Sequence, residues 1–229
     1  FKALKKPKAI IFDWDNTLVD TWPLIQNSID ETMKQMGKEP WGLEKVRDNV
    51  HKSMRESFPE IFGTNWEQAG EIYKNSYRSM HLINLQFLPA GLELINTIAQ
   101  HNILQFVISN KLGPTLRKEI KNLGIENLFF ACVGAHDANY DKPNRHPVEL
   151  ALLGSDLELG RDEIWFIGDT IADVECAYNA GCTPIIYGHN SNQISKTIPK
   201  DILQNGRDNC GAVATYFDHQ EVIDLLASF

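Results

Sequence analysis

The chain has 229 residues, a net charge of −8 at neutral pH and 43% hydrophobic residues. This length allows one large domain with an insertion, and the composition is that of an ordinary globular protein. The negative charge argues against a broad nucleic-acid-binding surface, and no apolar run reaches the roughly 18 residues of a membrane span. The N-terminal residues lack a secretory-signal pattern. We therefore expect a cytoplasmic protein with no nucleic-acid or membrane partner, and the sequence leaves its oligomeric state open.

The four cysteines give no sign of a metal site or a disulfide framework. They have no CxxC spacing, and most lie in or beside apolar runs: Cys132, Cys176, Cys182 and Cys210. This pattern predicts reduced, mostly buried thiols rather than a zinc site.

Five short runs of apolar and β-branched residues predict buried strands, at residues 9–12, 104–108, 129–133, 164–167 and 184–187. Continuously apolar strands are typical of a parallel sheet covered on both faces. Helical patterns alternate with them at residues 92–99, 116–123 and 171–180, and the last two are followed by Gly124 and Gly181 as helix stops. The alternation predicts an α/β fold with a Rossmann-like, doubly wound parallel sheet.

The interval from 20 to 88 interrupts this alternation. It carries amphipathic helical patterns near residues 24–33, 41–58 and 66–82, with stops at Gly37, Pro59 and Gly63. We interpret it as an all-helical insertion, with a cap domain at 21–87 and a core domain at 1–20 and 88–229. The polar stretch 190–209 is expected to be surface structure.

The first predicted strand leads into Asp13 and Asp15. Residues two apart in an extended chain point the same way, so the two carboxylates are expected to project together at the carboxyl edge of the sheet, where ligands bind. Close like charges need a cation or a shared proton. The alternative interpretation is a simple turn, because the Asp-Asn-Thr sequence that follows Trp14 favours turns and caps.

Three further segments carry polar groups, and each has a purely structural alternative. Ser109 and Asn110 can hold a phosphate oxygen through a hydroxyl and a backbone N–H, or can begin a loop. Lys142 can serve phosphate as a point charge, or can be solvated. Asp169 and Asp173 suit a hard cation such as Mg²⁺, or can cap a helix.

The order of these segments resembles the haloacid dehalogenase superfamily across the whole chain. The family's DxDx[TV] opening matches residues 13–17, its Ser/Thr motif Ser109, its Lys motif Lys142, and its GDxxxD motif residues 168–173. The insertion is similar to the small helical cap of the phosphoglycolate-phosphatase-like branch. The resemblance implies a Mg²⁺-dependent phosphatase acting on a small phosphorylated metabolite.

The resemblance also implies the reacting groups. Asp13 would attack phosphorus and form an aspartyl phosphate, while Asp15 would protonate the leaving oxygen and then activate water. The implied Mg²⁺ ligands are Asp13, Asp169 and the backbone carbonyl of Asp15. Asp173 would ligate the metal through water or hold Lys142.

The implied phosphate-binding groups are the Ser109 hydroxyl, the Asn110 backbone and the Lys142 ammonium, with Thr17 orienting the first loop. Two departures from the family pattern stand out. Asn16 replaces a common Gly, which predicts a left-handed backbone that Asn tolerates. The second Pro that relatives often have two residues after the first is missing after Pro143, where Asn144-Arg145-His146-Pro147 follow, and this predicts a later helix start.

The residues around these motifs suggest further contacts. The later helix start would let Arg145 or His146 reach the substrate. Arg47, His51 and Arg55 fall on one stripe of a helix and either meet a second anionic group or form a solvated face. Trp14 and Trp22 either wall the pocket or pack in the core.

Other activities use the same framework. A sugar-phosphate mutase would need the same residues, a phosphonatase would need a Schiff-base lysine in the cap, and a non-catalytic binding module would not need the intact motif set. The lysines that leave the second alternative open are Lys34, Lys38, Lys45, Lys52 and Lys74. A dehalogenase is disfavoured because it has no need of Asp15 as an acid.

Overall fold

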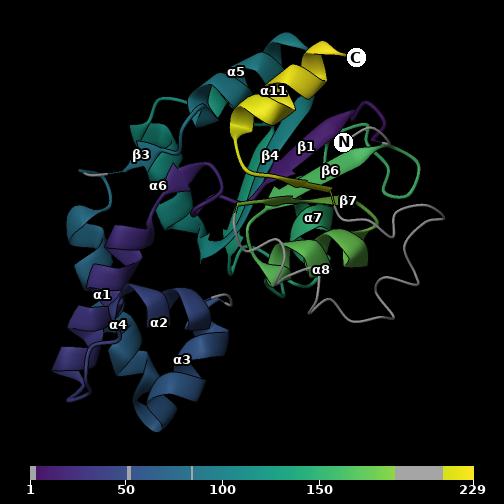
Figure 1. Ribbon diagram of the computed structural model, residues 1–229. Coiled ribbons are helices and arrows are strands. Elements are labelled where there is room, and N and C mark those ends of the chain that lie inside the picture. The colour runs from purple at the N-terminus through teal and green to yellow at the C-terminus, as the bar shows by residue number, and fades with distance from the viewer. Residues whose placement is uncertain (1–3, 51–52, 84, 189–213) are drawn as a thin grey trace.

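The computed structural model describes residues 4–50, 53–83, 85–188 and 214–229 (Figure 1). A parallel sheet of order β5-β4-β1-β6-β7-β8 forms its centre. The strands are β1 (Ala9–Phe12), β4 (Leu104–Leu112), β5 (Ala131–Ala135), β6 (Ile164–Gly168), β7 (Thr183–Tyr187) and β8 (Ala214–Tyr216). The predicted α/β class with a parallel sheet is confirmed.

Helices cover both faces of this sheet. In β1, Ile10 and Phe12 belong to one apolar cluster and Ala9 and Ile11 to another, because successive side chains of a strand point to opposite faces. The helices of the first cluster are α5 (Gly91–Gln100), α6 (Gly113–Asn122) and α11 (His219–Ala227). Those of the second are α7 (His146–Ala151) and α8 (Ile171–Ala180). Burial on both faces explains why the strands are apolar throughout.

Several details of the core differ from the prediction. β5 starts at Ala131 instead of 129, with two residues between it and the 3-10 turn η2 (Glu126–Leu128), and Phe130 just before the strand is 46% exposed. β8 and α11 were not predicted. The three residues of β8 are too few for a periodic pattern, but Asp218 and Glu221 form a capping box that marks the start of α11. The stretch 190–209, predicted to be surface structure, lies outside the described residues.

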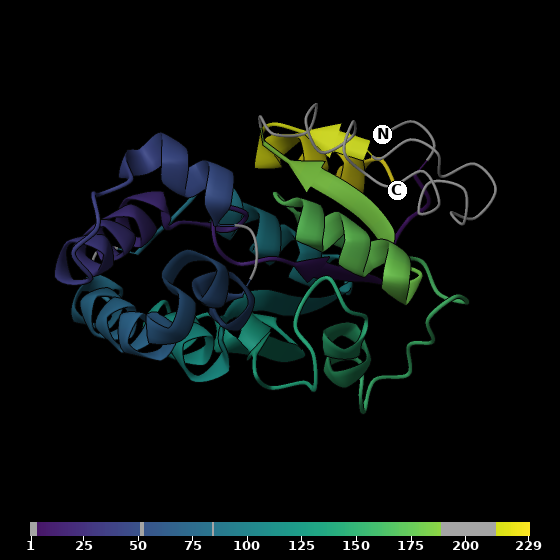
Figure 2. The same ribbon diagram turned by 90° about the horizontal axis from the view of Figure 1, so that it is seen from below.

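The helices of residues 22–80 form a group of their own beside the sheet (Figures 1 and 2). They are α1 (Trp22–Gln35), α2 (Gly42–Asn49), α3 (Met54–Phe62) and α4 (Trp66–Met80), with a 3-10 turn η1 (Gly63–Asn65) before the last. Their buried apolar residues form a separate cluster: Ile25, Ile29, Met33, Val46, Phe58, Phe62, Ala69 and Tyr77. The chain enters and leaves this group through an antiparallel ribbon of β2 (Val19–Asp20) and β3 (Gln86–Phe87). The division into cap and core domains stays a prediction.

Two expectations within this group are wrong. The single helix expected at 41–58 is two helices, so Arg47 lies in α2 and Arg55 in α3 and they share no stripe; His51 lies outside the described residues. Pro59 does not end a helix but is the sixth residue of α3, where Phe58 and Phe62 are buried around it. Burial of these aromatic side chains stabilises the helix enough to offset the missing N–H donor. Gly63, at φ 58°, is the actual stop.

The described part of the chain includes no helix long and apolar enough to cross a membrane. Three of the cysteines are free thiols, with Cys176 and Cys182 buried and Cys132 partly buried. Burial raises the pKa of the Cys176 thiol well above its usual range, so it is expected to stay protonated. Cys210 lies outside the described residues.

Candidate active site

The carboxyl ends of neighbouring strands bring the motif residues together at one edge of the sheet. Asp13 directly follows β1, Ser109 lies in the last part of β4, and Asp169 directly follows β6. Lys142 comes from the loop between β5 and α7. The predicted residues that line one pocket at this edge are Asp13, Asp15, Ser109, Asn110, Lys142 and Asp169. Thr17 and Asp173 do not line the pocket but contact residues that do: Thr17 contacts Asp169, and Asp173 contacts Lys142.

Three buried carboxylates form a cluster at the base of the pocket. One oxygen atom from each of Asp13, Asp169 and Asp173 lies within 4.8 Å of those of the other two. The Asp173 side chain packs against Gly168, where an added Cβ would lie 2.3 Å from its carboxyl carbon. Glycine is therefore required at this position so that the Asp173 carboxylate can approach the end of β6.

Lys142 is the cation that the structure places against this cluster. Its Nζ lies 2.8 Å from Asp13 Oδ1 and 2.5 Å from Asp173 Oδ1, and its side chain is buried. Burial alone would lower the pKa of Lys142, but Asp13 and Asp173 raise it, so the ammonium stays charged. One lysine cannot neutralise three ionised carboxylates, so full ionisation of the cluster needs further positive charge.

The pKa values of two of these carboxylates, Asp13 and Asp169, are raised, first by burial and then by repulsion from neighbouring carboxylates. The pKa of Asp13 is raised to about 7, first by burial and then by repulsion from Asp173, while Lys142 acts to lower it. Burial and the nearby Asp13 raise the pKa of Asp169 well above its usual range. Buried, negatively charged oxygen ligands are what a hard cation such as Mg²⁺ prefers. The residues present therefore fit a divalent metal ion.

Polar neighbours fix both ends of Lys142. The Asn110 side chain donates to the Lys142 carbonyl and accepts from its backbone N–H, each at 3.0 Å. Asp173 Oδ2 accepts from the backbone N–H and the hydroxyl of Thr170, which caps α8. The sequence left two roles open for Asp173, to ligate the metal through water or to hold Lys142. Its direct contact with Lys142 favours the second role. The Asn110 side chain has a positioning contact that was not predicted.

The loop after β1 is held by its own side chains. Asn16 adopts φ 59°, the left-handed conformation that was predicted, and its side-chain oxygen accepts from the backbone N–H groups of Thr21 and Trp22 at the start of α1. The Thr17 hydroxyl donates to Asp169 Oδ1 at 3.1 Å. This loop therefore connects the first and fourth motifs.

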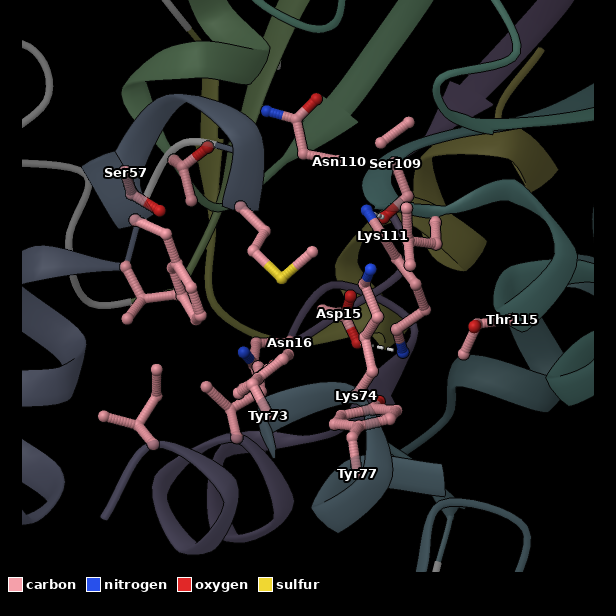
Figure 3. Close-up of a pocket in the computed structure, with 18 of the residues that line it drawn as sticks. Asp15, Asn16, Ser57, Tyr73, Lys74, Tyr77, Ser109, Asn110, Lys111 and Thr115 are labelled. Carbon is pink, nitrogen blue, oxygen red and sulfur yellow. Dashed lines mark hydrogen bonds and ion pairs between the residues drawn. The ribbon is translucent and has the colours of Figure 1, made fainter. Parts of the chain in front are cut away.

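Residues of the helical group complete the pocket (Figure 3). Figure 3 shows Ser109, Asn110 and Lys111 on one side and Tyr73 and Tyr77 on the other. The remaining lining residues from the helices are mainly apolar: Trp22, Ile25, Ile29, Met54, Ser57, Phe58, Ile61, Lys74 and Arg78. The pocket thus pairs a charged wall from the sheet edge with a largely apolar wall from α1, α3 and α4.

A buried polar network beside Asp15 was not predicted. Lys111 Nζ lies 2.6 Å from Asp15 Oδ1 and 2.6 Å from Glu119 Oε2. Glu119 also accepts from Trp14 Nε1 at 2.7 Å and Tyr77 Oη at 3.1 Å, and its Oε1 lies 2.8 Å from His81 Nδ1. Because Leu116, Glu119, Ile120 and Leu123 share a helix face, a charged residue within an apolar stripe was the available signal.

Several residues considered from the sequence do not line the pocket. Arg145, the N-cap of α7, pairs with Glu149 of that helix, and His146 stacks on Tyr140. Neither lines the pocket, contrary to the expectation from the sequence. Trp14 is fully buried, whereas Trp22 does line the pocket.

The basic residues of the helical group are also mostly placed elsewhere. Arg47 lies over the Trp22 ring, with 5.4 Å between its guanidinium carbon and the ring centroid. Arg55 Nε lies 2.6 Å from Asp141 Oδ2, next to Lys142 in the chain. Among the cap lysines that fall within the described residues, Lys74 alone lines the pocket.

Known proteins are similar in sequence to this chain over most of their length. A phosphoglycolate phosphatase of Photorhabdus laumondii is 27% identical over 218 residues, which cover 90% of this chain and 92% of the relative. A phosphoglycolate phosphatase of Yersinia pestis is 27% identical over 228 residues, covering 93% and 94%.

This chain is also similar to solved structures of haloacid dehalogenase-like proteins and matches a family model of these hydrolases. A HAD-superfamily hydrolase of Ehrlichia chaffeensis matches with a TM-score of 0.64 and 26% identity, covering 99% of this chain and 98% of that one. A haloacid dehalogenase-like family protein of Streptococcus pneumoniae matches with a TM-score of 0.75 and 22% identity, covering 96% and 98%. The model of the haloacid dehalogenase-like hydrolases matches residues 10–186. The chain therefore belongs to the haloacid dehalogenase-like hydrolase family.

Proposed function

We propose that this protein is a Mg²⁺-dependent phosphatase that hydrolyses a small phosphate monoester through an aspartyl phosphate on Asp13. The observation that carries the proposal is the position of Asp13, which lines the pocket while Lys142 and two further carboxylates surround it. Support for the substrate class comes from relatives named phosphoglycolate phosphatase that align over about nine-tenths of the chain. We propose residues 21–87 as the cap over this site.

In the first step, a carboxylate oxygen of Asp13 attacks the phosphorus atom of the ester. The bond between phosphorus and the ester oxygen breaks, and Asp15 gives its proton to the departing oxygen, so that an alcohol leaves. Lys142, the Ser109 hydroxyl and the Asn110 backbone N–H neutralise the oxygens of the transferring group. The products of this step are the alcohol, the aspartyl phosphate and ionised Asp15.

In the second step, water replaces Asp13 on phosphorus. Asp15 now takes a proton from the attacking water, and the bond between phosphorus and the Asp13 oxygen breaks. Inorganic phosphate leaves, the Asp13 carboxylate is regenerated, and Asp15 is again protonated for the next cycle. One residue thus serves as acid and then as base.

The proposed ligands of Mg²⁺ are Asp13, Asp169 and the backbone carbonyl of Asp15. A bound ion would offset the repulsion among the buried carboxylates and neutralise charge on the phosphoryl oxygens. Asp173 is proposed to act chiefly by positioning Lys142, whose Nζ it contacts at 2.5 Å. Thr17 is proposed to orient Asp169 through its hydroxyl.

The test is phosphate release from 2-phosphoglycolate and a panel of other small phosphate esters, with Mg²⁺ or with a chelator. We expect release that needs Mg²⁺ and that falls by several orders of magnitude in Asp13→Asn, as removal of a covalent nucleophile does. Exposed Asp156 supplies the matched control, since Asp156→Asn makes the same chemical change on the surface and should leave release unchanged.

The covalent intermediate has its own assay. An acyl phosphate reacts with hydroxylamine to give a hydroxamate, so quenching the reaction with hydroxylamine should label Asp13, which mass spectrometry of the digested protein detects. Phosphate release without any label at Asp13, or full activity in Asp13→Asn, would refute the proposed mechanism.

A further inference from the structure

The groups around Asp15 form a chain of contacts that the steps above do not use. Lys111 Nζ bridges Asp15 Oδ1 and Glu119 Oε2 at 2.6 Å each, and its side chain is only 7% exposed. Glu119 is fully buried and comes from α6, eight residues after Lys111. A buried carboxylate with so many donors is fixed in one orientation, and it fixes the ammonium that it binds.

The ammonium is confined from a third side as well. Lys111 Nζ lies 4.9 Å from the centroid of the Tyr77 ring, a cation–π geometry. The Tyr77 hydroxyl donates to Glu119 Oε1, so the same aromatic residue contacts both members of the pair. Lys111 is therefore held between α4 and α6 and has little freedom to move away from Asp15.

We infer that Lys111, held by Glu119, is a positioning residue for the proposed acid/base Asp15. Of the two carboxylates that Lys111 contacts, Asp15 is less buried than Glu119. The Asp15 side chain is 19% exposed, so its own packing does not fix its carboxyl group. The Lys111 ammonium binds Oδ1 and leaves Oδ2 as the oxygen that meets the ester oxygen. Misplacement of a reacting group by about 1 Å can cost about a hundredfold in rate, so this restraint matters for proton transfer.

This inference rests on the proposed function and has a signature of its own. A general acid matters most for esters whose leaving oxygen is strongly basic, such as the alkoxide of 2-phosphoglycolate. Acetyl phosphate is nearly the same size, but its acetate leaves without protonation. Loss of acid positioning should therefore lower kcat/KM for 2-phosphoglycolate far more than for acetyl phosphate, because kcat/KM reports the step in which the ester bond breaks. The ratio of the two values also cancels the amount of folded enzyme.

The variants are Lys111→Met, Lys111→Arg and Glu119→Gln, with Asp15→Asn as the reference and Lys118→Met, at an exposed lysine of α6, as the matched control. General acid catalysis contributes about 10²- to 10⁴-fold, so we expect Asp15→Asn to shift the ratio by about a hundredfold or more. Lys111→Met and Glu119→Gln should shift it in the same direction by about tenfold or more. Lys111→Arg keeps the charge and should restore most of the ratio, and Lys118→Met should not move it.

Each other outcome overturns a different statement. If the wild-type chain hydrolyses neither compound in Mg²⁺, the proposed function fails. If it hydrolyses both and Asp15→Asn shifts the ratio while Lys111→Met lowers both values equally, the inference fails and the proposed function stands. An unchanged ratio in Asp15→Asn overturns the acid role itself and the inference with it.

Discussion

Replacing the proposed nucleophile should make the metal-free protein more stable. Asp13 is buried among like charges, and its pKa of about 7, against an ordinary value of 3.8, means that ionising it costs about 4 kcal/mol more in the folded than in the unfolded chain. Asp13→Asn has the same shape and no charge. At pH 8 in a chelator, its free energy of unfolding should therefore exceed that of the wild type by up to about 4 kcal/mol.

The sign of the pH dependence follows from the raised pKa. Stability from a group whose pKa is higher in the folded state is complete below its unfolded pKa and is lost as the pH rises through its folded pKa. The advantage of Asp13→Asn should therefore shrink as the pH falls from 8 toward 4. Mg²⁺ should also reduce it, because an ion at about a hundred times its dissociation constant stabilises the wild type by about 2.7 kcal/mol and the variant less.

Urea unfolding followed by tryptophan fluorescence measures these differences, since the chain has five tryptophans. The matched control is Asp156→Asn, an exposed carboxylate for which the change should stay within about 0.5 kcal/mol. A variant at Asp13 that is less stable than the wild type at pH 8 without metal would contradict the reasoning. It would mean that the contact with Lys142 stabilises Asp13 by more than its burial costs.

Two further predictions concern stability alone. His219 is buried, with a pKa lowered to about 4 by burial, and its Nε2 contacts the Thr17 carbonyl at 2.8 Å. Its contribution is present above about pH 6.5 and is lost as the pH falls toward 4, so the wild type should lose about 2 kcal/mol more than His219→Gln between pH 7 and pH 5 in urea unfolding. Equal losses would disprove this. Arg55→Met should cost about 2 kcal/mol, because it leaves the buried Asp141 carboxylate unpaired, whereas Arg145→Met, which breaks an exposed pair, should cost less than about 0.5 kcal/mol. Equal costs in the same assay would show that the Arg55 contact adds nothing.

The sheet and the motif residues could be predicted because each signal is local. A buried parallel strand is apolar along its whole length. The residue that follows such a strand lies at the carboxyl edge of the sheet, as do the residues that follow the neighbouring parallel strands. Asp13 after β1 and Asp169 after β6 follow this rule. To infer that Asp13 and Asp169 lie close together, only the order of the strands is needed in addition. The alternation of strands and helices along the chain allows few such orders.

The network around Glu119 could not be predicted in the same way. Its partners come from the first loop, from β4 and from α4, and no sequence pattern says that Trp14, Lys111 and His81 meet at one carboxylate. The break between α2 and α3 was missed for a related reason. No Gly or Pro marks it, and the helical spacing of the sequence continues through residues 50–53, between the end of α2 at Asn49 and the start of α3 at Met54.

The two-stranded ribbon at the base of the helical group has a consequence for how that group is attached. Val19 pairs with Phe87 and Asp20 with Gln86, so the chain leaves the sheet and returns to it at adjacent points. Antiparallel neighbours of this kind lie about 5 Å apart and can be joined by a two-residue turn. A shortened chain with an Asn-Gly turn between Asp20 and Gln86 would keep the ribbon as an ordinary hairpin. The helices of residues 22–80 are therefore inserted into one connection of the sheet, at a point where the two ends of that connection already pair with each other.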